Sequence, residues 1–145
     1  MDQVMWTQRP LPTVPDVARA VWRRELCTPV DLTVSRNQLQ ATVRTAELRD
    51  RAPVDVDELL LVYEELASNG MRHGRSPVAV CVVAASGGWL VDVTDAAVES
   101  PPVPAVDRDP VDGGLGLHLV ARLCRTHGWT VDDGRKHVWA CVTAA

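Results

Sequence analysis

The hydrophobic positions of the chain follow a helical period in three segments and a strand pattern in five others. The helical segments are 35–50, 55–73 and 117–126, and the strand segments are 21–26, 78–84, 89–94, 129–132 and 137–143. Pro29 interrupts the pattern after the first strand, and Gly74 and Gly128 are expected to end the second and third helices. Several helices with mostly antiparallel strands predict an α+β fold, a two-layer sandwich with the helices on one face of the sheet.

The segment 55–73 is the most informative of the three helices. Asp55 is the expected N-cap, and Glu58 three residues later completes a capping box. One face of this helix is predicted to enter the core, and its residues are Leu59, Val62, Tyr63, Leu66 and Gly70. Gly70 costs a helix about 1 kcal/mol relative to alanine, which suggests close packing or close approach of a ligand.

Polar residues follow a neighbouring stripe of the same helix. Glu65 and Asn69 are one turn apart, Arg72 flanks them, and Glu64 projects about 100° away from Glu65. A carboxylate and a carboxamide supply oxygen atoms that suit Mg²⁺ and its water ligands. Taken alone, such a stripe is more typical of a solvated helix face.

The other two helices are simpler amphipathic segments. In 35–50, Leu39 and Val43 share one face with Ala46. In 117–126 the expected apolar face consists of Leu119, Val120, Leu123 and Cys124. Ser86–Gly88 and Asp133–Lys136 are expected to turn the chain between the two antiparallel strand pairs.

Two further features carry candidate chemistry. Asp95 stands at the end of a strand, where a carboxylate can accept a hydrogen bond from an exocyclic amine. The next segment, 96–112, contains four prolines and no periodicity, which is typical of a lid or binding loop or of a disordered segment. A glycine-rich run, Gly113–Gly116, then opens a helix and could bring backbone N–H groups close to a phosphate. The run matches neither a P-loop nor the Rossmann spacing.

Composition excludes several classes of function. The 145 residues carry a net charge of −4, so nothing in the overall charge points to nucleic acid. No apolar run is long enough for a membrane helix, and the first residues do not form a signal sequence, so a cytoplasmic protein is expected. The four cysteines form no CxxC pair, which argues against zinc. The excess of arginine over lysine is typical of a GC-rich bacterial genome.

The motifs, taken in order, resemble the ATP-binding domain of the GHKL (Bergerat-fold) superfamily, and within it the small bacterial anti-sigma-factor kinases. Glu65–His73 (ELASNGMRH) is similar to the N-box, and 91–95 (VDVTD) to the strand that carries the adenine-recognising aspartate. Residues 114–117 (GLGL) resemble the G-x-G-L motif after the lid. Residues 129–139 resemble the closing hairpin with its G-K-x-V-W ending.

The resemblance implies roles for these residues. Glu65 would be the general base that orients or deprotonates a substrate hydroxyl, Asn69 would bind Mg²⁺ bridging the ATP phosphates, and Asp95 would bind the adenine amino group. The loop 96–112 would be the ATP lid. The further nucleotide-binding residues would be Arg72, His73, Gly113, Gly114, Leu115, Gly116 and Leu117.

One departure from the family pattern concerns the lid. The family continues from its aspartate as D-x-G-x-G, whereas this chain has Ala96 and Ala97 and no glycine there. If that glycine has a positive φ, Ala97 is expected to be strained by about 1 kcal/mol or more. Weak or absent ATP binding is then expected.

The expected activity is that of an ATP-dependent serine/threonine protein kinase that phosphorylates an antagonist protein. Its partners would be a sigma factor, that antagonist, or both, and regulators of this kind are often homodimers. The alternative is a non-catalytic interaction module that sequesters a regulator. The catalytic half of a histidine kinase lacks its phosphoacceptor hairpin here, and gyrase- or chaperone-type ATPases need further domains. The expected organisation is an N-terminal arm (1–20) and one ATP-binding domain (21–145).

Overall fold

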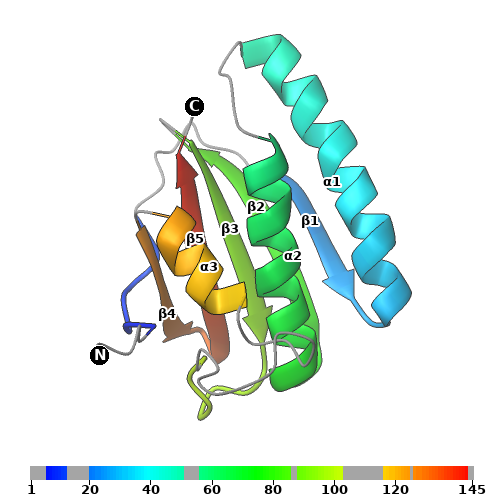
Figure 1. The fold of residues 1–145 in the computed structure, drawn as a ribbon. Helices are drawn as coiled ribbons and strands as arrows, with labels where there is room; N and C mark the ends of the chain where they lie inside the picture. Colours follow the sequence, from blue (N-terminus) through cyan, green and yellow to red (C-terminus); the bar gives the residue numbers. More distant parts are fainter. Residues whose placement is uncertain are drawn as a thin grey trace.

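The computed structural model describes residues 6–12, 20–50, 56–85, 88–102, 116–124 and 126–143. Within these ranges the chain forms three helices and five strands, as Figure 1 shows. In chain order they are β1 (Ala20–Leu26), α1 (Pro29–Asp50), α2 (Val56–His73), β2 (Val78–Ala85), β3 (Gly88–Asp95), α3 (Gly116–Leu123), β4 (Thr126–Asp132) and β5 (Arg135–Thr143). The predicted α+β class is confirmed.

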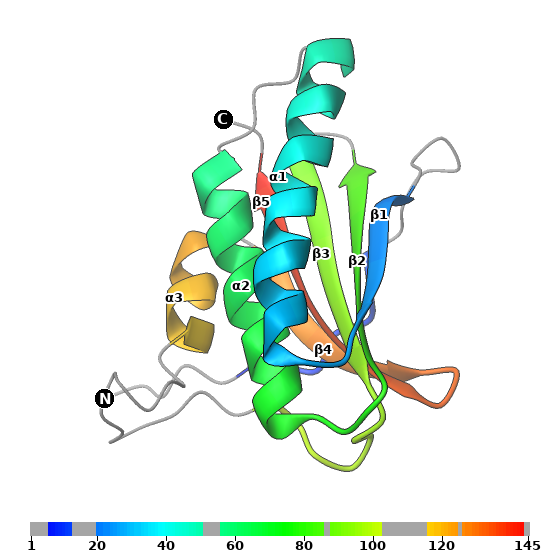
Figure 2. The ribbon, with the colours of Figure 1, turned by 90° about the vertical axis from the view of Figure 1, so that its right-hand side faces the viewer.

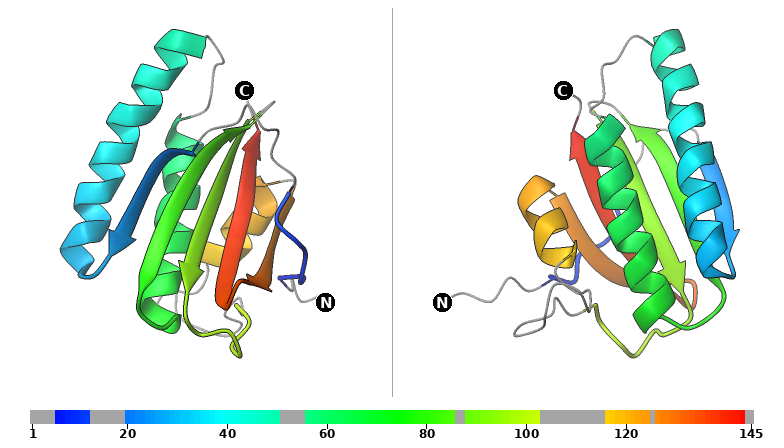
Figure 3. Two further views of the ribbon diagram at one scale, coloured as in Figure 1. Left: turned by 180° about the vertical axis from the view of Figure 1, so that it is seen from behind. Right: turned by 45° about the vertical axis from the view of Figure 1, so that its right-hand side comes forward.

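The strands form one antiparallel sheet in the order β1-β2-β3-β5-β4. The three helices lie together on one face of this sheet (Figures 2 and 3), as the two-layer expectation required. α2 lies over the middle of the sheet, between α1 and α3. β1 is an edge strand, paired with β2.

The core lies between α2 and the central strands. Each residue predicted for the core face of α2 is buried, and Leu60 and Ala67 join them. A Cβ on Gly70 would lie 2.9 Å from Cγ1 of Val93, so this glycine allows the helix to approach β3 closely. The predicted core residues Leu39 and Val43 of α1 are fully buried as well.

α1 begins earlier than the hydrophobic period predicted, at Pro29 instead of Ser35. Proline suits the first position of a helix because its missing N–H would have no intrahelical acceptor there. The Asp31 carboxylate accepts hydrogen bonds from the backbone N–H groups of Cys27 and Thr28, both at 2.8 Å. These contacts cap the helix start, so the expectation that Pro29 interrupts structure was wrong. The expected N-cap of α2, Asp55, lies outside the described residues.

α3 is shorter than expected, and only Val120 and Cys124 of its predicted apolar face are buried. It ends at Leu123, and Gly128, expected to end it, lies inside β4 opposite Trp139. Leu119 and Leu123 are 39% and 37% exposed, which corrects their assignment to the apolar face. The side chains that enter the core are Leu117, Val120 and Cys124. Pairing of the following residues with β5 ends the helix early.

The β4–β5 hairpin has the turn that the sequence predicted. Its two central residues, Asp133 and Gly134, have φ values of 52° and 73°. Two consecutive positive φ values are the signature of the type I′ turn, which matches the twist of the paired strands.

Residues 6–12, part of the expected N-terminal arm, run along the free edge of β4 (Figure 3, left). Trp129 exchanges two backbone hydrogen bonds with this segment, to Thr7 O and from Arg9 N. The Trp6 side chain is buried, and its Nε1 donates to the carbonyl of Leu117 in the first turn of α3 at 3.3 Å. This segment is therefore packed against the domain.

Candidate functional site

Glu64 and Glu65 are neighbours on α2, and their side chains point in different directions. Glu64 forms an ion pair with Arg36 of α1, with Nε and Oε2 3.4 Å apart. Glu65 instead points to the start of α3. Asn69, one turn further along α2, is half-buried. The predicted divergence of the two glutamates is confirmed.

Glu65 lies directly against Gly116, the first residue of α3. A Cβ built on Gly116 would lie 1.8 Å from Glu65 Oε2 and 2.6 Å from its Cδ, so only glycine leaves room for the carboxylate. Burial raises the pKa of Glu65, the neighbouring Glu64 raises it further, and Arg72 opposes both. The carboxylate is thus more basic than a solvated glutamate and is held where a helix N-terminus begins.

Asp95 is the last residue of β3, and its carboxylate is enclosed. Its Oδ1 accepts the Ala97 N–H at 2.7 Å and, more weakly, the Arg75 N–H at 3.4 Å. Its Oδ2 lies 3.3 Å from Nζ of Lys136. Gly74 also lies against the carboxylate, because a Cβ at this position would be 2.6 Å from Asp95 Cγ.

Lys136 was not predicted as a site residue. Lys136 is the only lysine of the chain and belongs to the closing-hairpin motif, so a signal was present. The register of β3 and β5 places it directly opposite Asp95. Its ammonium group also donates to the Ser100 carbonyl at 2.8 Å.

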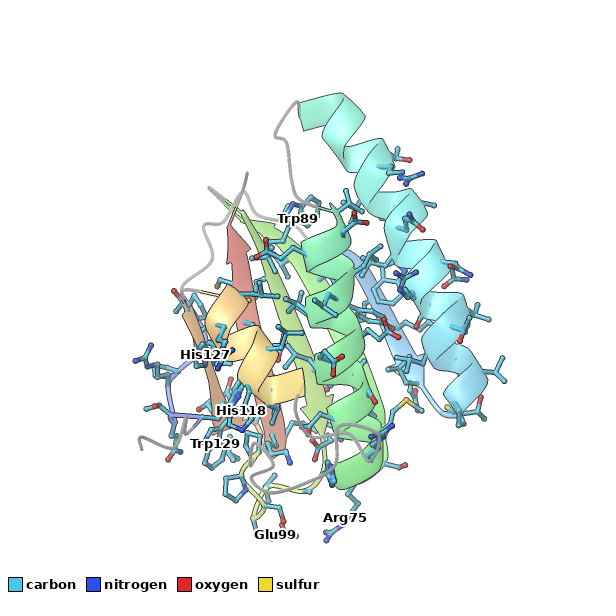
Figure 4. All side chains as sticks on the ribbon, viewed as in Figure 1. Arg75, Trp89, Glu99, His118, His127 and Trp129 are labelled. Atoms are coloured by element: carbon cyan, nitrogen blue, oxygen red, sulfur yellow. The ribbon has the colours of Figure 1, made fainter. Side chains whose placement is uncertain are left out.

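The first residues after Asp95 form a tight turn at the end of the sheet. Ala96 N donates to Arg75 O at 2.8 Å, and Ser100 N donates to Ala97 O at 3.1 Å. The Arg75 and Glu99 side chains form an ion pair of 2.9 Å on the surface, at the end of the molecule where Figure 4 labels them. Among the described non-glycine residues only Asp133 has a positive φ, so the expected strain at Ala97 does not occur.

The remaining residues singled out from the sequence fall into three groups: exposed, buried, and outside the described residues. Arg72 and His73 end α2 with exposed side chains. The Leu117 side chain is buried in the core, so a ligand could reach only its backbone. Gly113, Gly114 and Leu115 lie outside the described residues, as does the loop 103–112.

The described residues fit the chemistry of Mg-ATP. Glu65 and Asn69 present oxygen atoms on one helix stripe, as a hard cation requires. A carboxylate has about four lone-pair positions, so Asp95 can accept one more hydrogen bond beside its protein partners. Gly74 and Gly116 keep the backbone close to both carboxylates.

No cluster of three histidine, cysteine or acidic residues suited to a metal ion occurs in the described ranges. None of the described helices has the length and apolar character of a membrane span.

A comparison with curated proteins found no match. The family model for the histidine kinase-like ATPase domain matches residues 7–142, nearly the whole chain. The match begins within the expected arm, before Val21, where the resemblance was expected to start. Domains of this GHKL type bind ATP, generally with Mg²⁺. The chain therefore belongs to the family of histidine kinase-like ATPase domains.

Proposed function

We propose that this protein binds Mg-ATP beside α2 and transfers the terminal phosphoryl group to a serine or threonine hydroxyl of an antagonist protein. The observation that carries the proposal is the position of the Glu65 carboxylate against the first residue of α3. There a carboxylate with a raised pKa lies at the N-terminus of α3, the end of a helix that favours anions. Family membership supports ATP as the phosphoryl donor.

Glu65 would act on the attacking hydroxyl group. Its carboxylate accepts the hydroxyl proton while the hydroxyl oxygen forms a bond to the γ-phosphorus, and the bond to the ADP oxygen breaks. Because burial raises its pKa, Glu65 is a better proton acceptor than a solvated glutamate. The reaction requires the ionised carboxylate, so the rate should rise with pH through this raised pKa.

The other residues would position the nucleotide. The Asn69 carboxamide would hold Mg²⁺, which neutralises phosphate charge when bound. Asp95 would accept a hydrogen bond from the adenine amino group, and the first N–H groups of α3 would contact phosphate. As a regulator of transcription, the protein would act in the cytoplasm on a sigma factor or its antagonist.

A second candidate is a module of the same fold that sequesters a regulator without chemistry. The observation in its favour is that Asp95 is already engaged by the Ala97 N–H and the Lys136 ammonium group. A carboxylate that already accepts hydrogen bonds from protein groups gains less stabilisation from a further hydrogen bond with adenine. The unstrained backbone at Ala97 weakens this alternative, because the missing glycine has no conformational cost.

The deciding experiment compares Glu65→Gln with Glu64→Gln, a matched control in which the neighbouring carboxylate faces α1. Calorimetry with ATP and ADP, with and without Mg²⁺, measures binding, and Asn69→Ala should abolish the Mg²⁺-dependent part. Transfer of labelled γ-phosphate to a purified antagonist measures the reaction. The proposal expects Glu65→Gln to keep nucleotide binding and to lose transfer by about 100-fold or more, with Glu64→Gln nearly unaffected. Binding without transfer in the wild type would contradict the kinase activity, and no binding at millimolar nucleotide would favour the module.

A further inference from the structure

Lys136 belongs to the closing-hairpin motif, but the family resemblance assigns no role to this buried cation. Its side chain is 4% exposed, and that of its partner Asp95 is 1% exposed. Lysine is almost never buried to this extent unless it is paired. The two residues face each other across neighbouring strands, and Asp95 also lies against Gly74, the residue that follows α2.

The ammonium group joins the two ends of the turn after β3. It lies 3.3 Å from Oδ2 of Asp95, where the turn begins, and donates to the carbonyl of Ser100, where the turn ends. The other oxygen of Asp95 accepts the Ala97 N–H inside the turn. Carboxylate, turn and β5 therefore form one hydrogen-bonded unit.

This arrangement has an electrostatic consequence. A buried carboxylate without a partner is costly, and so is a buried ammonium ion without one. The pair therefore orients the Asp95 carboxylate in the protein without a ligand. A group that is already oriented loses less conformational freedom when it binds a ligand.

We propose that Lys136 is a positioning residue that fixes the Asp95 carboxylate and the 96–100 turn before nucleotide binds. This inference rests on the proposed function as far as adenine is concerned. The anchoring of the turn is a property of the protein alone. It follows that Lys136 controls nucleotide affinity through Asp95, without any contact to phosphate.

The test compares Lys136→Met with Arg135→Met. Arg135 is the adjacent cation on the same strand, and its guanidinium group donates to the Pro77 carbonyl and to Thr94 Oγ1 instead. The first readout is amide hydrogen exchange at Ala97 and Ser100 in the protein without nucleotide. The second is the dissociation constant for ATP with Mg²⁺. Lys136→Arg tests rescue by a second cation, and Lys136→Gln keeps a polar group in case methionine prevents folding.

In Lys136→Met and Lys136→Gln, the amide hydrogens of Ala97 and Ser100 should exchange about tenfold faster or more. The reason is that the turn loses its contacts with the Lys136 ammonium group. Their dissociation constants for ATP should rise by about tenfold or more, and Lys136→Arg should recover part of both effects. Arg135→Met should change neither by more than about twofold. Unchanged exchange in both Lys136 variants would overturn the inference. If the wild type binds no ATP, the proposed function fails, whereas the exchange rates still decide whether Lys136 anchors the turn.

Discussion

Gly74 should be irreplaceable even though it lies outside any regular element. A Cβ at this position would lie 2.5 Å from the Gly70 carbonyl oxygen and 2.7 Å from Oδ2 of Asp95, and real Cβ atoms essentially never approach other heavy atoms so closely. The carbonyl belongs to the last turn of α2 and cannot move alone. The carboxylate is held by Lys136 and by the Ala97 N–H. Gly74→Ala must therefore displace backbone or break the buried ion pair.

The magnitude follows from these two contacts. Overpacking a tight site costs about 1–3 kcal/mol, and two neighbours that cannot yield place Gly74→Ala near 3 kcal/mol. Alanine also lowers the conformational entropy of the unfolded chain, which offsets about 0.4–1 kcal/mol of this cost. The free energy of unfolding should fall by about 2 kcal/mol, and Tm by about 4–8 °C for a chain of this size.

The assay is thermal and urea unfolding of Gly74→Ala beside Gly134→Ala. Gly134 has a φ of 73°, and a Cβ there would have no atom within 4 Å, so alanine at this position is strained without a clash. That control should lose about 1 kcal/mol and leave the Asp95 site intact. Gly74→Ala should also weaken ATP binding. Wild-type Tm and wild-type affinity in Gly74→Ala would refute the close approach of Gly74 to Asp95.

Three further predictions address other parts of the molecule. Gly116→Ala should push the flexible Glu65 carboxylate aside, so that phosphoryl transfer in single-turnover assays falls about 100-fold or more while the fold survives. A transfer rate close to that of the wild type would argue against Glu65 as the base. The hydrogen bond from His137 to Asp92 raises the pKa of the histidine. This bond therefore stabilises the folded state fully below the unfolded pKa of 6.5, and the stabilisation is lost as the pH rises through the folded-state pKa. Urea unfolding of wild type and His137→Gln should differ at about pH 5.5 and converge at about pH 8.5. Backbone N–H groups of Cys27 and Thr28 lower the pKa of Asp31, so Asp31→Ala should lose stability at neutral pH, and the difference from wild type should shrink on acid titration below pH 3.8.

The sequence determined much of this protein because helices and strands are built from local patterns. The β-branched run of β2 and the apolar stripe of α2 identify these elements without any tertiary contact. Gly70 is unusual inside a helix, and its position against Val93 explains why glycine is needed there. The start of α1 at Pro29 was missed because its first turn buries little hydrophobic surface. This turn is stabilised by the Asp31 cap, which the hydrophobic pattern does not report.

The site itself depends on contacts between residues far apart in the chain. The order of the residues gave Glu65 and Asp95 as candidates, but the β3–β5 register brought Lys136 to Asp95. The packing of α3 against α2 likewise placed Gly116 against Glu65. Periodicity reports which face of an element is buried, whereas partners across a sheet or between helices depend on how the elements pack. The chemical groups of this protein are therefore readable from its sequence, and their pairing is decided by the tertiary structure.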